Sequence, residues 1–378
     1  MRIIIVSAYH GGSHQAWADG YIGYSSHQVE CVTLPARFWK WRMHGGAVTL
    51  ARRFLDSIES GDLVVPDMLL FTDMVDVSTF MALVRRSCPD IPATLYMHEN
   101  QLTYPLPATS ESGPMRRQKG ERDLHYSFVN YVSMLAADRI YFNSEFHRRE
   151  LFDELPRYLR HFPEYRELQS IPALKAKSKV LPLGIDFARL AHNANTIGYG
   201  GPPLIVWNQR WEYDKNPGQF FNALHRLAEE GRPFHLAVCG ENYAQEPSEF
   251  EAARAQLADR IVHWGYAGQQ EYARLLWQAT ATASTAIHEF FGISIMEAMY
   301  CETYAALPSR LSYPELLPEE MHRECLYGTD MELLQKLRWA VENPEAAREV
   351  GRRLAQNASR FDWQRLAPVY DSEFERLR

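Results

Sequence analysis

Several features that mark specialised protein classes are missing from this sequence of 378 residues. No apolar stretch approaches the roughly 20 residues that a membrane-spanning helix needs, and the apolar run at residues 3–6 is too short for a secretory signal. The five cysteines are widely spaced and include no C-x-x-C pair, which argues against a disulfide framework and a thiolate zinc site. With 21 glycines and 21 prolines, the chain is neither collagen-like nor of low complexity. We therefore expect a cytoplasmic globular protein without membrane contact.

Two nucleotide-binding motifs are missing as well. The sequence contains no G-x-x-x-x-G-K-[ST] segment, and its first glycine-rich turn does not follow G-x-G-x-x-G. Each motif places backbone amides around phosphates, so an ATPase and a standard dinucleotide-binding protein are disfavoured.

Charge is unevenly divided along the chain. Residues 1–190 carry 22 Lys and Arg against 21 Asp and Glu, whereas the remainder carries 18 against 26, for a net charge of −7. The first half is therefore the better partner for a polyanion.

Short apolar runs rich in branched residues alternate with longer amphipathic stretches, a pattern typical of parallel sheets covered by helices. We predict an α/β fold with two doubly wound domains, at residues 1–183 and 204–360, joined by a Gly- and Pro-rich connection at 184–203. Residues 361–378 should form an amphipathic helix that returns to the first domain. Among the other helices we expect one near 47–58 and a single long one near 331–358.

Candidate ligand-binding residues follow two strands of the first domain. His10-Gly11-Gly12-Ser13-His14 comes directly after the first strand and opens a helix, so its amides suit a phosphate or a sugar hydroxyl. His98, Glu99 and Asn100 end the fourth strand, where α/β sheets present their ligands. No second pair of ligands at a metal spacing follows His98, so we expect no zinc there.

Two further segments mix cations with other polar or aromatic side chains. Trp39-Lys40-Trp41-Arg42 offers the stacking surfaces and charge that an exposed nucleobase needs, although these tryptophans could instead anchor a connection to the core. Arg116, Arg117 and Lys119 could contact phosphates, or could form an ordinary solvated face.

The second domain carries a pair of cations after its first strand. Arg210 can meet a diphosphate through a fork of donors, and Lys215 can meet it as a compact point charge. Taken alone, both could equally be solvated loop residues. Gly240 follows the next strand and starts a loop that could read a nucleotide base.

Two glutamates separated by seven residues form the sharpest local pattern. Glu289 and Glu297 flank the turn Phe291-Gly292-Ile293. If a helix begins near Ser294, Glu297 lies in its first turn, and both carboxylates can face one site together with exposed amides. Such a site suits the paired hydroxyls and the pyrophosphate of a nucleotide sugar.

Together, the glycine turn, the Arg210–Lys215 pair and the E-x7-E segment resemble the retaining glycosyltransferases of GT-B type. The segments 8–14, 34–42, 96–105 and 142–146 are further similar to the tRNA-queuosine mannosyltransferase family. The resemblance implies two Rossmann-like domains that face each other across a cleft and close over the donor. It also implies transfer of mannose from GDP-mannose to queuosine in the anticodon of tRNA-Asp, with retention at the anomeric carbon.

The family pattern implies roles for these residues. Glu289 would hold sugar hydroxyls, Glu297 would accept from the ribose, and His98 would touch the sugar near the acceptor. The expected catalytic residues are His98, Glu289, Arg210 and Lys215. The expected donor-binding residues are Gly11, Gly12, Arg210, Lys215, Gly240, Phe291, Gly292, Ile293 and Glu297. The expected acceptor-binding residues are His14, Trp39, Lys40, Trp41, Arg42, Glu99, Asn100, Arg116, Arg117 and Lys119.

No cofactor or metal is expected, because D-x-D triplets are absent and the cations of the chain can neutralise the leaving diphosphate. Front-face attack is the preferred mechanism, while double displacement through Glu99 or Glu289 stays open. We expect Glu289→Ala and Lys215→Ala to abolish transfer with little change in melting temperature.

Two other functions stay open. The first is a GT-B glycosyltransferase acting on a small metabolite or glycan, which the net charge of −7 favours slightly over RNA binding. The second is a catalytically silent nucleotide-sugar or RNA-binding module, against which the intact glutamates and cations count.

Overall fold

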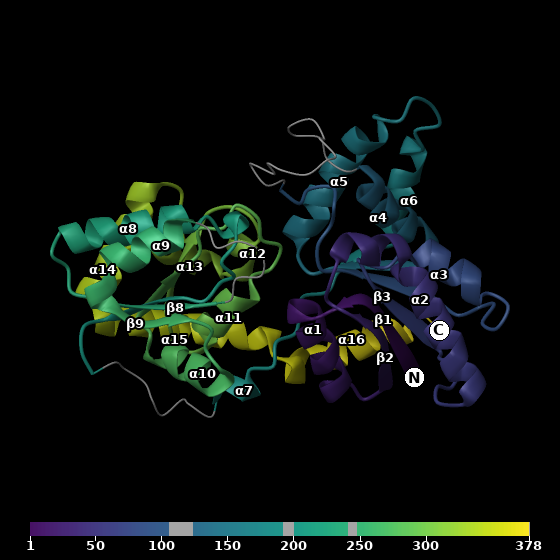
Figure 1. Cartoon of the computed structure of the whole chain (residues 1–378), viewed down its shortest axis with the longest axis horizontal. Helices are drawn as coiled ribbons and strands as arrows, with labels where there is room; N and C mark the ends of the chain where they lie inside the picture. Colours follow the sequence, from purple (N-terminus) through teal and green to yellow (C-terminus); the bar gives the residue numbers. More distant parts are fainter. Residues whose placement is uncertain (106–123, 192–199, 241–247, 378) are drawn as a thin grey trace. The chain divides into compact units, whose positions relative to one another are not determined.

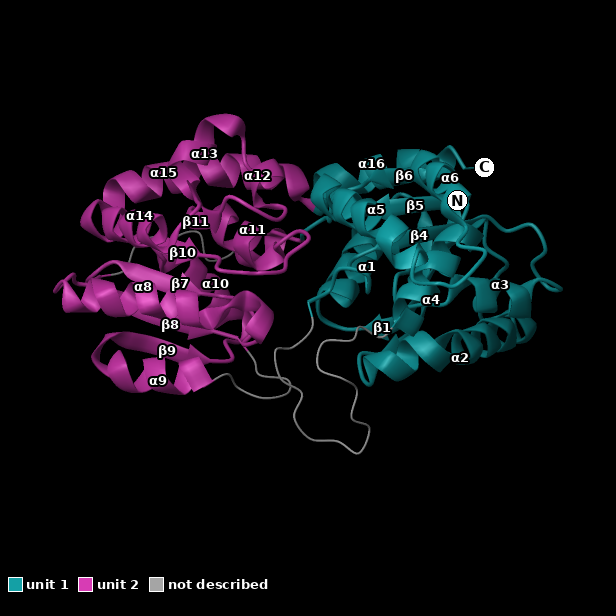
Figure 2. Cartoon of the chain, turned by 90° about the horizontal axis from the view of Figure 1, so that it is seen from above, with its two compact units in different colours: residues 1–185, 363–378 teal, residues 186–362 magenta. Residues whose placement is uncertain are grey.

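A computed structural model describes residues 1–105, 124–191, 200–240 and 248–377. The chain forms two compact units (Figure 2): residues 1–185 with 363–378, and residues 186–362. Within the described ranges, no helix is both long and apolar enough to cross a bilayer. The five cysteines, all inside those ranges, form no disulfide.

Unit 1 is built on a six-stranded parallel sheet in the order β2-β1-β3-β4-β5-β6. Its strands are β1 (Arg2–His10), β2 (Gln28–Pro35), β3 (Met68–Thr72), β4 (Ala93–Met97), β5 (Arg139–Phe142) and β6 (Ser178–Val180). The central strands are apolar and buried along their whole length, because helices cover both faces of a parallel sheet.

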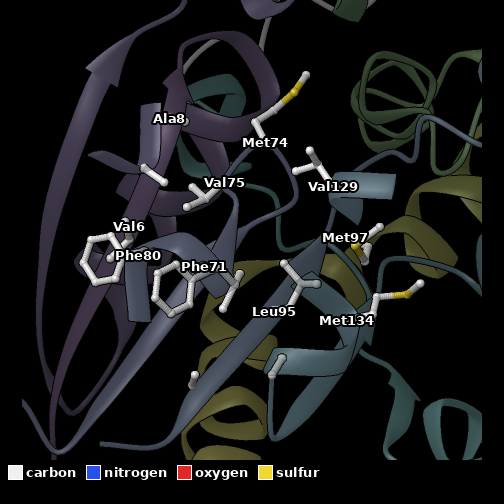
Figure 3. Packing of buried hydrophobic residues seen from close by; sticks show 14 of the residues in the cluster. Val6, Ala8, Phe71, Met74, Val75, Phe80, Leu95, Met97, Val129 and Met134 are labelled. Atoms are coloured by element: carbon white, nitrogen blue, oxygen red, sulfur yellow. The ribbon is translucent and has the colours of Figure 1, made fainter. Parts of the chain in front are cut away.

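Side chains cap the starts of two helices in unit 1. Asp76 accepts from the Thr79 amide at the start of α3, and Ser144 accepts from the His147 amide at the start of α5. The helices are α1 (Gly12–Tyr24), α2 (Trp39–Ser60), α3 (Val77–Val84), α4 (Leu124–Ala136), α5 (Glu145–Leu159), α6 (Ile171–Ala176) and α16 (Trp363–Glu375), with the 3-10 turn η1 (Leu168–Ser170). The core of the unit includes Val6, Phe71 and Leu95 of the sheet and Phe80 of α3, whose ring centroid lies 5.1 Å from that of Phe71 (Figure 3).

Helix α16 packs against α1, far away in the sequence (Figure 1). The Asp371 carboxylate accepts from the hydroxyls of Tyr21, Ser25 and Ser26, at 2.6–2.8 Å, and from the Ser26 amide. These donors lower the pKa of Asp371 although its burial opposes them. The indole of Trp17 also donates to Tyr370 of α16.

Unit 2 has a second six-stranded parallel sheet, in the order β12-β11-β10-β7-β8-β9. Its strands are β7 (Leu204–Trp207), β8 (His235–Cys239), β9 (Ile261–Gly265), β10 (Ala281–Ala283), β11 (Tyr304–Pro308) and β12 (Leu326–Tyr327). Its helices are α7 (Ala188–Ala191), α8 (Pro217–Glu229), α9 (Ser248–Gln256), α10 (Gln269–Gln278), α11 (Ile293–Tyr300), α12 (Tyr313–Leu316), α13 (Glu319–Cys325), α14 (Asp330–Glu342) and α15 (Pro344–Ala358), with the 3-10 turns η3 (Tyr213–Lys215), η4 (Ala258–Arg260) and η5 (Ser359–Phe361).

Two predicted helices differ from the structure. The single helix predicted near 331–358 is two helices, because α15 begins at Pro344, which lacks an amide hydrogen and favours the first position of a helix. Helix α2 begins at Trp39, eight residues before the predicted start at 47. Residues 39–42 therefore lie in its first turn and not in a connection.

Candidate active site

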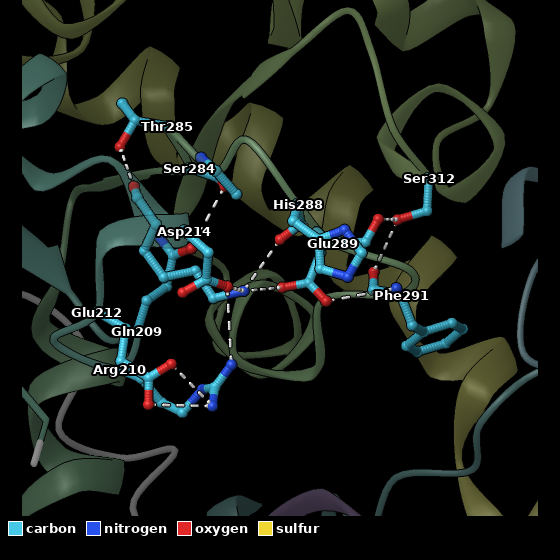
Figure 4. A network of polar contacts seen from close by, with 12 residues as sticks. Gln209, Arg210, Glu212, Asp214, Ser284, Thr285, His288, Glu289, Phe291 and Ser312 are labelled. Atoms are coloured by element: carbon cyan, nitrogen blue, oxygen red, sulfur yellow. Dashed lines mark hydrogen bonds and ion pairs between the residues drawn. The ribbon is translucent and has the colours of Figure 1, made fainter. Parts of the chain in front are cut away.

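A network of charged side chains surrounds Lys215 at the end of η3 (Figure 4). Its ammonium lies 3.1 Å from a carboxylate oxygen of Glu289 and 3.1 Å from one of Asp214, and it donates to the carbonyl of His288 at 3.2 Å. Lys215 is only 6% exposed. Two of the four residues that the sequence predicts as catalytic, Lys215 and Glu289, are therefore in direct contact.

Two loops are tied together to form this network. One follows β7 and contains Lys215, and the other follows β10 and contains Glu289. The hydroxyl of Thr285 donates to the carbonyls of Lys215 and Asn216, and the amide of Ile287 donates to the carbonyl of Asp214. The carboxyl ends of β7 and β10, which are neighbours in the sheet, thus bring together residues about 74 positions apart.

Arg210 lies at the exposed edge of the same network. Its guanidinium contacts Glu212 at 3.1 Å and lies 3.7 Å from the buried Asp214 carboxylate, with about half of the side chain exposed. Arg210 and Lys215 share Asp214 as a partner. An anion that approaches from solvent would reach Arg210 first.

The network holds two cations and three carboxylates, those of Glu212, Asp214 and Glu289. Burial alone would lower the pKa of Lys215, but the carboxylates of Glu289 and Asp214 outweigh it and raise that pKa. Burial and the Lys215 charge lower the pKa of His288 to about 4. Lys215 is therefore charged and His288 neutral at pH 7.

The turn before α11 places backbone amides next to Glu289. Gly292 has φ of +91°, a left-handed conformation that favours glycine, and a β-carbon there would lie 3.2 Å from the Tyr313 ring. The amide of Phe291 points to the Glu289 carboxylate at 3.5 Å. Because α11 begins at Ile293, its first amides have no acceptor within the helix.

Glu297 lies one residue further along α11 than the sequence predicts. The helix begins at Ile293, so Glu297 is its fifth residue and falls outside the first turn. The carboxylate is buried, accepts from the Tyr272 hydroxyl at 2.6 Å and forms an ion pair with Arg189 of α7. The sequence does not predict Arg189 as a site residue, because Arg189 lies in the segment predicted to be a connection.

The β1–α1 turn and the end of β4 meet in unit 1. His14 of α1 and His98 after β4 have ring centroids 4.2 Å apart, and both rings approach Asp73, which follows β3. The nearest Asp73 oxygen lies 3.4 Å from Nε2 of His14 and 3.3 Å from Nδ1 of His98. We call these three buried residues the His–Asp cluster.

The His–Asp cluster has donor atoms of the kind that bind metals. One donor atom from each residue lies within 4.8 Å of the other two. The sequence argument against a metal considers only the residues near His98, whereas the fold brings its partners from β3 and α1. Sequence reasoning misses Asp73 because its role depends on that long-range proximity.

The other predicted site residues that follow β1 and β4 differ in their contacts. A β-carbon on Gly11 would lie 2.5 Å from that of Ala36, so close packing requires glycine there, and Gly12 begins α1. Glu99 accepts from Gln101 at 3.1 Å. Asn100 is fully buried, and its side-chain oxygen accepts from the amides of Leu102 and Thr103. Asn100 therefore stabilises a turn.

The start of α2 exposes aromatic rings to solvent. Trp41 is 61% exposed and Trp39 36%, and the Lys40 ammonium lies 5.6 Å from the centre of the Trp39 ring. Arg42 donates to the carbonyl of Pro35 at 3.2 Å. Anchoring of these tryptophans in the core, the alternative for this segment, is thus wrong.

Four predicted site residues remain, and the structure describes one of them, Gly240. Gly240 follows β8, and its amide donates to the carbonyl of Gly265 at 3.1 Å. Arg116, Arg117 and Lys119 lie outside the described residues.

Comparisons with known proteins agree with this division into two units. Residues 2–185 match the family described as tRNA-queuosine alpha-mannosyltransferase N-terminal, and residues 192–360 match Glycosyl transferases group 1. A tRNA-queuosine alpha-mannosyltransferase from Drosophila melanogaster is 30% identical over 379 residues, which cover 98% of this chain and 95% of that protein. This chain belongs to the tRNA-queuosine alpha-mannosyltransferase family. As a member of that family it is a glycosyltransferase, which confirms the prediction of an enzyme.

Solved structures show that this tRNA-queuosine alpha-mannosyltransferase family member has the GT-B fold. Sucrose-phosphate synthase from Thermosynechococcus elongatus matches with a TM-score of 0.69 at 14% identity, covering 100% of this chain and 99% of that chain. Alr3699/HepE from Anabaena in complex with UDP matches with a TM-score of 0.66 at 13% identity, with 100% of both chains covered. The predicted α/β fold with two Rossmann-like domains is confirmed.

Proposed function

We propose that this chain transfers mannose from GDP-mannose to queuosine in the anticodon of tRNA-Asp, with retention at the anomeric carbon. The observation that carries the proposal is the full-length relationship to the Drosophila tRNA-queuosine alpha-mannosyltransferase, which spans both units. Residues 2–185 alone match the N-terminal part of that family, so the likeness extends to the half in which we expect the acceptor to bind.

The donor is assigned to unit 2. The diphosphate of GDP-mannose can replace Glu289 as a partner of Lys215 and draw Arg210 away from Glu212. The Glu289 carboxylate then becomes able to accept from mannose hydroxyls. A buried lysine that exchanges a carboxylate for a phosphate keeps its charge compensated throughout.

The acceptor is assigned to unit 1. Trp39, Lys40 and Trp41 at the start of α2 offer exposed rings and a cation, as recognition of unstacked anticodon bases requires. Glu99 and His98 directly follow β4. We assign Glu99 to the reacting hydroxyl of queuosine and His98 to the mannose near that hydroxyl.

Transfer proceeds by front-face attack in this proposal. The bond between the anomeric carbon and the phosphate oxygen breaks as the queuosine hydroxyl attacks from the same side, and the departing phosphate takes the hydroxyl proton. Arg210 and Lys215 neutralise the charge that develops on the diphosphate, so no metal or cofactor is assigned a role in transfer. Because the substrate is a tRNA, we place the reaction in the cytoplasm.

Nucleoside mass spectrometry tests the proposal. The protein is incubated with queuosine-containing tRNA-Asp and with either GDP-mannose or UDP-glucose, and the digested nucleosides are weighed. We expect one added hexose on queuosine with GDP-mannose alone. The same gain with UDP-glucose only would refute the donor, and glycosylation of a small acceptor without any tRNA product would favour the metabolite glycosyltransferase. The same tRNA lacking queuosine is the control, and it should stay unmodified.

A further inference from the structure

Asp73 of the His–Asp cluster is a buried carboxylate without a lysine or arginine partner within the described parts of the chain. It is 1% exposed, and its ion pairs there are those with His14 and His98. A buried carboxylate costs several kcal/mol unless a positive charge or hydrogen bonds compensate it. At least one of the two ring nitrogens that face Asp73, Nε2 of His14 or Nδ1 of His98, must therefore carry a proton.

The backbone around His98 is held rigidly at the end of β4. Its amide donates to Asp73 at 3.0 Å, and its carbonyl accepts from the Asn143 side chain at 2.9 Å. The ring is packed between His14 at 4.2 Å, Trp17 at 4.8 Å and Tyr96 at 4.8 Å, measured between ring centroids. These three neighbours restrict the rotation of the His98 ring.

The two ring nitrogens of His98 have different surroundings. Both nitrogens are buried and neither forms a hydrogen bond with good geometry among the residues that the structure describes, but Nδ1 lies 3.3 Å from the Asp73 carboxylate, a contact that Nε2 lacks there. Native proteins rarely bury a polar atom without a partner, and at functional sites a bound ligand can supply one. Burial and the neighbouring His14 lower the pKa of His98 to about 4, despite the opposing effect of Asp73, so its ring is neutral at pH 7.

We propose that Asp73 is a positioning residue for the transfer reaction: it holds His98 with the proton on Nδ1, so that Nε2 offers a lone pair to a substrate hydroxyl. Asp73 also accepts from the His98 amide at 3.0 Å and lies 3.4 Å from the His14 ring. In a neutral imidazole, the group next to one nitrogen decides which nitrogen keeps the proton, and a carboxylate favours the proton on its own side. The assignment of His98 to the substrate rests on the proposed function.

Histidine NMR tests the tautomer without any substrate. In nitrogen–proton correlation spectra of protein labelled with ¹⁵N-histidine, the His98→Gln variant identifies the His98 signals. We expect a neutral ring protonated on Nδ1 at pH 7, and a shift towards the other tautomer in Asp73→Asn. A ring protonated on Nε2 in the unsubstituted protein, or a spectrum that Asp73→Asn leaves unchanged, would overturn the proposal.

Kinetics test the consequence for transfer. Asp73→Asn keeps an oxygen for the His98 amide but loses the charge, and we expect kcat to fall about tenfold to hundredfold with little change in KM. Asp138→Asn is the matched control, because Asp138 accepts from the amide of Ala93 at the other end of the same strand, at 2.8 Å. Normal kcat in Asp73→Asn, or an equal loss in Asp138→Asn, would overturn the positioning role.

Metal analysis distinguishes the positioning role of Asp73 from metal binding by the His–Asp cluster. Protein dialysed against Zn²⁺ and then against buffer should retain no stoichiometric zinc, and transfer should withstand EDTA. Zinc retained at one per chain and lost in Asp73→Asn would make the cluster a metal site and overturn the proposal.

If the unsubstituted protein transfers no mannose to queuosine, the proposed function fails while the NMR result still decides the role of Asp73.

Discussion

Arg189 forms an ion pair with Glu297, the second glutamate of the E-x7-E segment. The two residues are 108 positions apart and come from α7 and α11 of the same unit. Tyr272 donates to the other oxygen of the carboxylate. Both Glu297 oxygens therefore have partners that fix their direction before any donor arrives.

The variant Arg189→Gln should weaken donor binding. It leaves Glu297 buried beside Tyr272 without a counter-charge, and we expect a loss of about 1–2 kcal/mol in unfolding free energy, less than for a fully buried pair because Arg189 is partly exposed. KM for GDP-mannose should rise more than kcat falls. Arg352→Gln, which removes an exposed arginine paired with Glu349, is the control. Equal KM values in both variants would contradict a role for the Arg189–Glu297 pair.

Lys215→Met should both abolish transfer and destabilise the protein. It leaves the Asp214 and Glu289 carboxylates without their shared cation, which should cost about 3 kcal/mol in unfolding free energy. This replaces the expectation from sequence that loss of Lys215 leaves the melting temperature nearly unchanged. Urea unfolding and mannose transfer are the measurements, and a variant as stable as the unsubstituted protein would contradict the importance of the contacts.

For Glu289→Gln the melting temperature should change little, because Asp214 still pairs with Lys215.

Gly292→Ala should disturb the turn before α11. A φ of +91° is strained for alanine, and the added carbon would lie 3.2 Å from the Tyr313 ring and 3.5 Å from the Glu289 side chain. We expect a loss of about 1–2 kcal/mol in stability, together with reduced transfer. Gly23→Ala, in α1 with no atom close to the new carbon, should instead leave stability unchanged or raise it. Equal melting temperatures for the two variants would refute the strain argument.

The low pKa of His288 predicts that acid weakens the fold. Because the folded pKa is about 4 and the unfolded value is 6.5, the unfolded chain binds the proton first as pH falls. His288 should therefore contribute no pH dependence above pH 6.5 and remove up to about 1.4 kcal/mol per pH unit between 6.5 and 4. Urea unfolding at pH 7.5, 6 and 5 should show a shallower decline for His288→Gln than for the unsubstituted protein. Parallel declines would show that His288 titrates normally.

Trp41→Ala should weaken tRNA binding without affecting stability. The ring is 61% exposed, so its removal costs little in the folded state. Loss of one stacked base is worth about 1–3 kcal/mol, or roughly tenfold to a hundredfold in affinity. Tyr165→Ala removes a still more exposed ring from the same unit and should leave affinity unchanged. Filter binding at a fixed salt concentration would reveal either outcome.

The sequence predicts what depends on local pattern. The apolar runs predict the parallel strands, and the E-x7-E spacing predicts the turn at Gly292. Asp73 and Arg189 escape prediction because their significance arises only when β3 approaches β4 and α7 approaches α11. Pro344 illustrates a different failure: the residue that begins α15 is present in the sequence, but the strong amphipathic pattern on both sides of it favours one continuous helix.

The anchoring of α16 by Asp371 has a consequence for synthesis of the protein. The first sheet is translated early, yet Trp17 and Tyr21 of α1 lack their partners Tyr370 and Asp371 until α16 leaves the ribosome. Unit 2 is complete in sequence before unit 1, so the half made first should be the half that finishes folding last. Nascent chains halted before Trp363 should accordingly present an apolar surface to chaperones and proteases that the released chain does not.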